Sequence, residues 1–339
     1  AIDLQGHQYE GGETLGFSLV RKGVNTAPQV VLGSSPYFHG PPVGPDRDDV
    51  FFGREQLLEK IKHQIQSGNT VLLEGNRRSG KSSVLRHLEG TEAIPGWIAV
   101  FADFQSAEGA KAKAGMPSES VWRSLAAALI KGLVPLQMEL PLPNGKILQP
   151  GSLLGYREAC RQGISEQAPW EDFLEYFQTI LLLLQRQNLG LVLMIDEFDK
   201  LQEGIDNGVT SPQIPENIRY LIQNHPRFVA IMTGSRRMQR LRQEYWSALY
   251  GLGNRIGVSA LDEDSARKLV TEPVKGRLDY TEESIQLILQ LTARQPFLVQ
   301  YLCNRIFELA AENKTTSITR TMVEHCASGV VRDNEHFAR

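Results

Sequence analysis

One eight-residue segment constrains the fold more than any other part of the chain. Residues 75–82 read Gly-Asn-Arg-Arg-Ser-Gly-Lys-Ser, which fits the pattern GxxxxGKS without a mismatch. An apolar run at 70–73 precedes the segment, and a helical pattern that includes Val84, Leu85 and Leu88 follows it. The glycines allow backbone N–H groups to converge on an anion, and the start of the helix adds its dipole. The segment therefore predicts a strand, a phosphate-binding turn and a helix. The alternative is a glycine-rich turn that merely ends a strand.

The same segment predicts a nucleotide cofactor. The Lys81 ammonium can reach the β- and γ-phosphates, and the Ser82 hydroxyl can hold Mg²⁺. We therefore expect ATP or ADP together with Mg²⁺. The residues expected to bind the nucleotide here are consecutive: Gly75, Asn76, Arg77, Arg78, Ser79, Gly80, Lys81, Ser82 and Ser83.

Short apolar runs alternate with helical patterns through the first three quarters of the chain. The runs are hydrophobic on both faces, as buried parallel strands are, and they lie at 70–73, 97–101, 190–195, 228–232 and 256–260. The helical patterns lie at 54–66, 80–89, 119–133, 170–187, 214–224 and 236–249. This alternation predicts an α/β fold of the P-loop NTPase class, with a parallel five-stranded sheet and helices on both faces. The proline- and glycine-rich segment 135–169 is predicted to be an insertion loop.

The strand patterns end near residue 261. Asp262 and Thr281 are suited to cap helices, and further helical patterns cover 297–312 and 319–327. We therefore predict an α/β core at 53–261 and an all-α lid subdomain at 262–330. Three segments flank these units: a β-like stretch at 1–35, expected to be the remnant of a preceding domain, a linker or wrapping arm at 36–52, and a tail at 331–339 that leads to a missing domain.

Two adjacent acids end one of the predicted strands. The run at 191–195 delivers Asp196 and Glu197 at its carboxyl end, where nucleotides bind in open α/β sheets. Asp196 is expected beside Mg²⁺, and Glu197 is expected to activate the attacking water as a general base. The alternative is a strand that simply runs into a polar loop. An extra strand between the two motifs, together with Glu197, favours a hydrolytic P-loop ATPase over a nucleotide kinase.

Polar and basic residues follow the predicted strand at 228–232, and Arg255 directly precedes the last predicted strand. Thr233, Ser235 and Arg236 can face the γ-phosphate, and Arg236 joins Lys81 and Glu197 as a predicted catalytic residue. Alternatively, Ser235 caps a helix, and the basic stretch from Arg236 to Arg242 is a solvated helix face or a partner contact. Arg255 is either an arginine finger for a neighbouring protomer or, as we favour, part of a salt bridge.

Composition excludes several other classes. With 36 basic and 39 acidic residues the net charge is −3, which argues against a wholly basic nucleic-acid binder. No apolar run approaches the roughly 18 residues that a membrane span needs, so no membrane partner is expected. The three cysteines are widely spaced and lack metal-ligand spacing, which argues against a disulfide scaffold and predicts a cytoplasmic protein.

On these motifs, residues 36–330 resemble the STAND class of AAA+-related P-loop ATPases. Within that class they are most similar to prokaryotic members that are related to archaeal ATPases and origin-recognition ATPases. The resemblance is carried by the turn at 75–82, the acids at 196–197, the segment 233–236, a Phe-Gly-Arg-Glu turn at 52–55 and a lid segment at 291–300. It implies that Phe52, Gly53, Arg54 and Pro296 lie near adenine and ribose. Arg294 departs from the family, which commonly has glycine there, and Pro296 alone can equally be a first-turn proline.

The resemblance also implies a function. It points to an ATP-hydrolysing molecular switch whose ATP or ADP state and self-association act on an effector, in defence or stress signalling. Two alternatives stay open. One is a DNA-associated AAA+ ATPase of the origin-recognition, helicase-loader or transposition-regulator type, which would contact nucleic acid through the basic stretch or a missing winged helix. The other is a nucleotide-binding scaffold without turnover.

Overall fold

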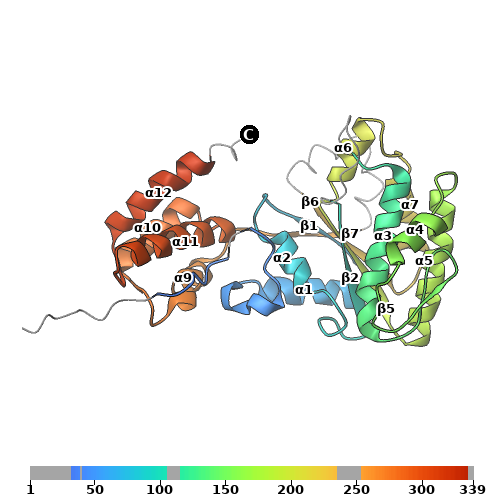
Figure 1. The fold of residues 1–339 in the computed structure, drawn as a ribbon, viewed down its shortest axis with the longest axis horizontal. Coiled ribbons are helices and arrows are strands. Elements are labelled where there is room, and N and C mark those ends of the chain that lie inside the picture. The colour runs from blue at the N-terminus through green and yellow to red at the C-terminus, as the bar shows by residue number, and fades with distance from the viewer. Residues whose placement is uncertain (1–31, 39, 105–114, 235–252, 335–339) are drawn as a thin grey trace, which may run out of the picture.

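The computed structural model describes residues 32–38, 40–104, 115–234 and 253–334, and for 329–334 the backbone alone. An α/β core and a helical lid lie toward opposite ends of the molecule (Figure 1). The predicted helix at 236–249 and most of the β-like stretch at 1–35 lie outside the described residues.

The core is built on one five-stranded sheet. All neighbouring strands pair in parallel, and their spatial order is β2-β5-β6-β1-β7. The strands are β1 (Thr70–Glu74), β2 (Trp97–Asp103), β5 (Gly190–Asp196), β6 (Phe228–Gly234) and β7 (Gly253–Gly257). The predicted fold class is thereby confirmed. The last strand begins three residues before the predicted run at 256–260, because β7 is an edge strand whose first residues are polar and partly exposed.

Helices cover both faces of this sheet. On one face α3 (Ser118–Leu133), α5 (Pro169–Arg186) and α7 (Ile214–Asn224) bury a large aromatic and aliphatic core that includes Trp122 and Phe173. On the other face α1 (Glu55–Gln66) and α2 (Lys81–Arg86) pack against the opposite side chains of the same strands. The alternating residues of β1 illustrate the split, since Leu72 faces the first core and Val71 and Leu73 the second.

The prediction of a loop at 135–169 is wrong. The segment forms a 3-10 turn (Val134–Leu136), a two-stranded antiparallel pair of β3 (Leu140–Pro141) and β4 (Ile147–Leu148), and a helix α4 (Tyr156–Gly163). Its apolar residues, among them Leu140, Leu148 and Ile164, are buried in the same core as α3. The prolines and glycines therefore separate short packed elements. A further short helix, α6 (Lys200–Asp206), follows the acids of β5 and was not predicted.

The lid consists mainly of four helices: α9 (Glu263–Thr271), α10 (Glu282–Thr292), α11 (Pro296–Glu312) and α12 (Arg320–Asn334). The predicted caps form, because Asp262 accepts from the Ser265 N–H at 2.8 Å and Thr281 accepts from the Ser284 N–H at 3.2 Å. A 3-10 turn (Glu272–Val274) and a short parallel pair of β8 (Asp279–Tyr280) and β9 (Ser317–Ile318) complete the subdomain. The helix α12 includes the first residues of the predicted tail.

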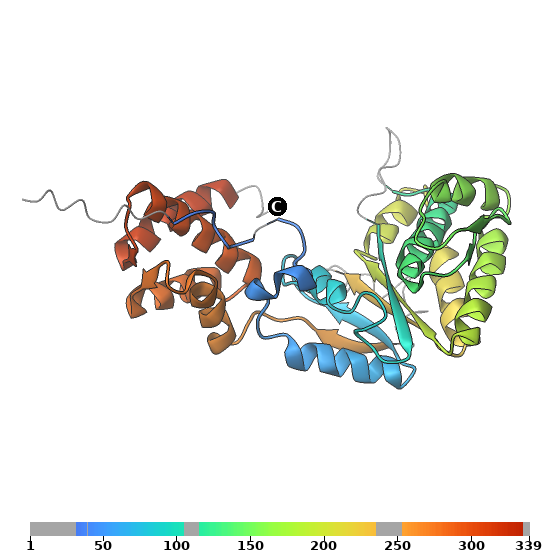
Figure 2. The same ribbon diagram turned by 60° about the horizontal axis from the view of Figure 1, so that its bottom comes forward.

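Residues 36–52, which we call the arm, lie between the lid and α2 (Figure 2). Tyr37, Val43 and Val50 are buried in the same apolar cluster as the lid helices. The Tyr37 hydroxyl donates to the Val270 carbonyl. The arm includes a 3-10 helix (Pro45–Val50), and at its far end Phe51 stacks on His87 of the core with ring centroids 3.5 Å apart. The arm therefore contacts both bodies. Among the described residues, no helix has the length and apolar character needed to cross a bilayer.

Candidate nucleotide-binding site

A cleft of about 1390 Å³ opens between the core, the arm and the lid. Its walls come from the turn at 75–82, the ends of β5 and β6, helix α6, the arm and the first turns of α11. Most of the predicted site residues line it, namely Phe52, Arg54, Asn76, Arg77, Arg78, Gly80, Lys81, Ser82, Ser83, Asp196, Glu197 and Pro296. Gly53, Gly75 and Ser79 do not line the cleft, and Arg236 lies outside the described residues. Tertiary structure thus brings together motifs that are more than 200 residues apart.

The turn requires glycine at both ends. Gly80 has φ 95° at the start of α2, a left-handed conformation that suits a residue without a side chain. A Cβ added at Gly75 would lie 2.6 Å from the Val258 carbonyl oxygen and 2.8 Å from the Ser79 Oγ. The backbone of residue 258 therefore fixes the turn closely from behind. The Ser79 hydroxyl is buried and has no hydrogen-bond partner among the described residues.

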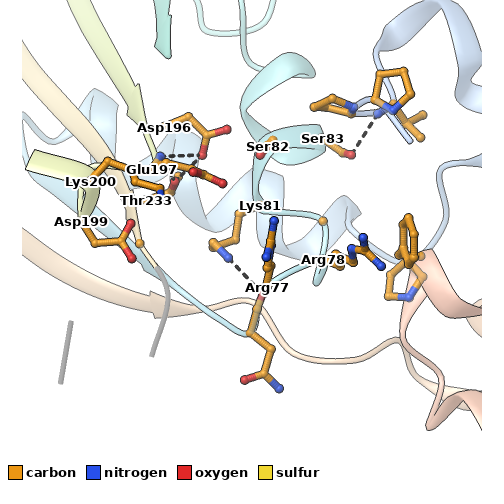
Figure 3. Close-up of a pocket in the computed structure, with 18 of the residues that line it drawn as sticks. Arg77, Arg78, Lys81, Ser82, Ser83, Asp196, Glu197, Asp199, Lys200 and Thr233 are labelled. Carbon is orange, nitrogen blue, oxygen red and sulfur yellow. Dashed lines mark hydrogen bonds between the residues drawn. The ribbon is translucent and has the colours of Figure 1, made fainter. Parts of the chain in front are cut away.

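The Lys81 side chain folds back toward the first residues of the turn (Figure 3). Its Nζ donates to the carbonyl oxygens of Gly75 at 3.1 Å and Asn76 at 3.0 Å. Burial lowers the pKa of this ammonium, and the carboxylates of Asp196 and Asp199 oppose that shift. The ammonium thus lies in a partly desolvated cleft, where its attraction to an anion is stronger than in bulk water.

The two predicted acids are held by a threonine on the neighbouring strand. The Thr233 hydroxyl donates to Asp196 Oδ1 and accepts from the Glu197 N–H at 3.1 Å. Asp196 is only 5% exposed and Thr233 is fully buried. Glu197 has φ 49°, an uncommon value for a residue with a side chain. Such conformations persist where the surroundings determine them, and they are frequent at functional sites.

Burial and hydrogen bonding distinguish the two carboxylates. Burial, reinforced by the neighbouring carboxylates of Asp196 and Asp199, raises the pKa of Glu197. A carboxylate with a raised pKa accepts a proton more readily than an ordinary one, which is the property required of a general base. Asp196 instead lies deeper, with its Oδ1 hydrogen-bonded to the protein.

Ser82 and Asp196 form a donor set that fits Mg²⁺. Figure 3 shows the Asp196 carboxylate directed toward Ser82, and both residues line the cleft. Hydroxyl and carboxylate oxygens are hard donors, and Mg²⁺ is commonly held by one or two carboxylates together with water and substrate phosphates. The described residues contain no group of three or more His, Cys, Asp or Glu arranged for a metal.

Two predicted nucleotide contacts have structural partners. The Ser83 Oγ accepts from the Val43 N–H at 3.0 Å, so its side chain is bound to the arm. Arg54 is buried and donates to the carbonyl oxygens of Ser79 at 3.1 Å and Ser259 at 2.8 Å. Burial lowers the pKa of Arg54. Its guanidinium therefore supports the turn from within the core.

The lid contributes residues that sequence reasoning missed. Phe297 and Gln300 of α11 line the cleft beside Pro296, and the ring of Phe297 lies under the guanidinium of Arg78. The Gln300 side chain accepts from the Phe38 N–H of the arm at 2.8 Å. No signal in a single sequence connects residue 78 with residue 297, so only the tertiary structure reveals this contact.

The remaining predicted residues lie elsewhere. Arg255 is absent from the cleft lining, and its Nε lies 3.8 Å from Glu74 Oε1, which is the salt-bridge arrangement favoured from the sequence. The basic residues from Arg236 to Arg242 and the cap candidate Ser235 lie outside the described residues. Thr233 does face the acids as described above.

Comparison with known proteins agrees with this fold. Residues 50–206 match the model of the AAA ATPase domain family. No curated protein matches the sequence. A Walker-type ATPase of Pyrococcus abyssi, paby2304, is similar in structure with a TM-score of 0.61 and 17% identity, over 88% of this chain and 76% of that one.

Two proteins of Aeropyrum pernix show the same similarity in fold. The ORC1 protein, solved in complex with DNA, aligns with a TM-score of 0.54 and 16% identity, over 86% of this chain and 69% of that one. The ORC2 protein, solved as ADPNP-ADP complexes, aligns with a TM-score of 0.51 and 13% identity over the same shares. The matched family and the fold together support an AAA+ P-loop ATPase.

Proposed function

We propose that the chain binds ATP with Mg²⁺ and hydrolyses it slowly as a molecular switch of the STAND type. The observation that carries the proposal is the network of Thr233, Asp196 and Glu197, which lies across the cleft from the lysine of the phosphate-binding turn. A merely nucleotide-stabilised scaffold does not require a buried hydroxyl that orients two acids. A hydrolase requires a positioned base beside the phosphates.

Each residue then has a distinct role. The backbone of the turn and Lys81 bind the phosphates, while Ser82 and Asp196 hold Mg²⁺, which neutralises charge on the phosphates when bound. Glu197 orients the attacking water and takes its proton. Phe52 and Pro296 line the cleft, and they are proposed to contact the base and ribose. Arg236 is proposed as a further contact to the γ-phosphate.

The switch follows from the position of the cleft. A ligand shifts a conformational equilibrium only by its differential affinity for the two states. Because core, arm and lid all line the cleft, the phosphates can favour one arrangement of the lid over another. Self-association in the ATP state and action on an effector in defence or stress signalling complete the proposal. The three cysteines are free and buried, which suits a reducing cytoplasm.

A DNA-associated AAA+ ATPase is the second candidate. It is supported by the structural similarity to the A. pernix ORC1 protein, whose structure contains DNA. This candidate predicts DNA affinity that falls steeply as salt rises, since phosphate contacts release counterions. Titrations of duplex DNA at low and high salt would separate the two, because the switch predicts no such affinity.

The decisive variant is Glu197→Gln. We expect it to bind ATP with unchanged affinity and to lose turnover by about 10²- to 10⁴-fold, the usual contribution of a general base. Isothermal titration and phosphate release measure the two quantities. Turnover at the wild-type rate would show that another group activates the water, and a wild-type chain that binds ATP without any turnover would favour the scaffold.

The raised pKa of Glu197 sets the pH dependence. Turnover should fall on acidification at a pH above the ordinary glutamate value of 4.5, because the base becomes protonated there. The native state binds this proton more tightly than the unfolded state, so the charged carboxylate destabilises the fold as pH rises through the raised pKa. Glu197→Gln should therefore raise the melting temperature at pH 7 and leave it unchanged below pH 4.5. Equal shifts at both pH values would contradict this assignment.

A further inference from the structure

One arginine of the phosphate-binding turn contacts the lid. The Cζ of Arg78 lies 3.9 Å from the ring centroid of Phe297, in the first turn of α11. Figure 3 shows the Arg78 side chain pointing from the turn toward the lid, away from the acids. The ring of Phe297 in turn stacks on Tyr301, with centroids 6.1 Å apart and planes 11° apart. The contact therefore joins the turn to two successive turns of a lid helix.

The backbone and charge at Arg78 are unusual. Its φ is 66°, in the left-handed region that residues with a side chain rarely adopt. Burial, together with the adjacent Arg77, lowers the pKa of its guanidinium. A half-buried cation next to a like charge on a strained backbone is unfavourable unless a partner compensates. The aromatic face of Phe297 supplies part of that compensation.

The lid side of the cleft carries no charge of its own. Among the described residues, those from the end of the core onward that line it are Leu261, Leu269, Pro296, Phe297 and Gln300. A charged group of the core that lines the cleft and also contacts the lid can therefore transmit the charge of bound phosphates to the lid. Arg78 lines the cleft and contacts α11, so it satisfies both conditions.

We propose that Arg78 couples the phosphates of the bound nucleotide to the lid, with Phe297 as the receiving residue. A planar guanidinium that stacks on a ring still has N–H groups directed outward in its own plane, where they can donate to phosphate oxygens. Once one partner orders the side chain, the other partner loses less entropy on binding it. ATP should therefore strengthen the contact and close the lid, and by reciprocity the contact should strengthen ATP binding.

The inference rests on the proposed nucleotide site, and a double-mutant cycle tests it. ATP affinity is measured by isothermal titration for Phe297→Leu, Arg78→Ala and the double variant. We expect Phe297→Leu to weaken ATP binding about fivefold, as the loss of one cation–π contact does. Arg78→Ala should weaken it further, and the Phe297 change should have no additional effect in that background. Phe297→Tyr keeps the aromatic face and should therefore retain the coupling to Arg78 that Phe297→Leu loses.

Hydrogen exchange provides the second readout. In the wild type, ATP should slow amide exchange in the first turns of α11, and this protection should disappear in Phe297→Leu even at saturating ATP. Melting curves of each variant establish that it is folded.

Two results would overturn the coupling. The first is that Phe297→Leu weakens ATP binding equally in the wild-type background and in the Arg78→Ala background. That result would mean that the ring contacts the nucleotide directly. The other is unchanged ATP affinity in Phe297→Leu. Either result in a chain that binds ATP leaves the proposed function intact, whereas a wild-type chain that binds no ATP would reject both.

Discussion

The two halves of the cleft differ in chemistry and in how they are held. The core half carries the charged groups, with Lys81 on the turn and Asp196 and Glu197 at the end of β5. A buried parallel sheet positions the acids through its register, and it positions the lysine through the turn that follows β1. The lid half presents the uncharged residues Pro296, Phe297 and Gln300, and it shares its apolar core with the arm.

In the proposed mechanism, the core half carries out the chemistry and the lid half responds to it. Groups on a rigid sheet can keep the close geometry that proton transfer needs. The described lid helices have an apolar core of their own, distinct from the two cores of the sheet, so the lid can move relative to the sheet without disrupting either. Variants in the two halves should therefore affect different measurements, and the comparison can be tested half by half.

The largest effect is expected at the turn. Lys81→Ala should abolish measurable ATP binding, because it removes the cation that lies beside the phosphate-binding turn. The sheet should remain intact. Calorimetric titration measures the affinity and circular dichroism the fold. Lys62→Ala, at a lysine of α1 that does not line the cleft, is the matched control and should bind ATP normally. Retained tight binding in Lys81→Ala would remove the basis of the site.

The arm should matter most for the stability of the lid. Tyr37 is 4% exposed within the lid core, and its hydroxyl bonds Val270. Tyr37→Ala should cost about 3–5 kcal/mol of unfolding free energy, as large aromatic deletions do, and Tyr37→Phe about 1 kcal/mol. Denaturant unfolding measures both. Unchanged midpoints would mean that the arm is only a linker.

An intermediate effect is expected where the two acids are oriented. Thr233→Val keeps the shape of the side chain and removes the hydroxyl that bonds Asp196 and Glu197. Turnover should fall roughly 10- to 100-fold, as when the support of a metal-binding or catalytic group is lost. Thr292→Val, at a buried threonine of the lid that bonds the Ile288 carbonyl, should leave turnover unchanged. Equal losses in both would indicate a general packing defect.

The smallest effect is expected at Arg255. Its pair with Glu74 spans 3.8 Å and is partly exposed, so Arg255→Ala should change stability by less than about 1 kcal/mol and leave turnover unchanged. A concentration-dependent collapse of ATPase activity would instead identify Arg255 as an arginine finger for a neighbouring copy.

Local patterns predicted most of the core. The strand, turn and helix around residues 75–82, the apolar strand before Asp196 and the caps at Asp262 and Thr281 form as predicted, because each depends on residues close in sequence. The packed elements at 135–169 and the short helix α6 were missed, since short segments owe their structure to tertiary burial more than to their own periodicity.

The sequence by itself determined which residues make up the candidate site: the lysine and the hydroxyl follow one strand, the two acids end another, and a parallel sheet brings the ends of both strands to one edge. Only the tertiary structure decided how that chemistry connects to the lid. Three contacts join residues that are 40 to more than 200 positions apart in the sequence. They are the hydrogen bond from Tyr37 to Val270, the hydrogen bond from Val43 to Ser83, and the stacking of Arg78 on Phe297. Such contacts depend on where whole elements pack, and no local pattern encodes them.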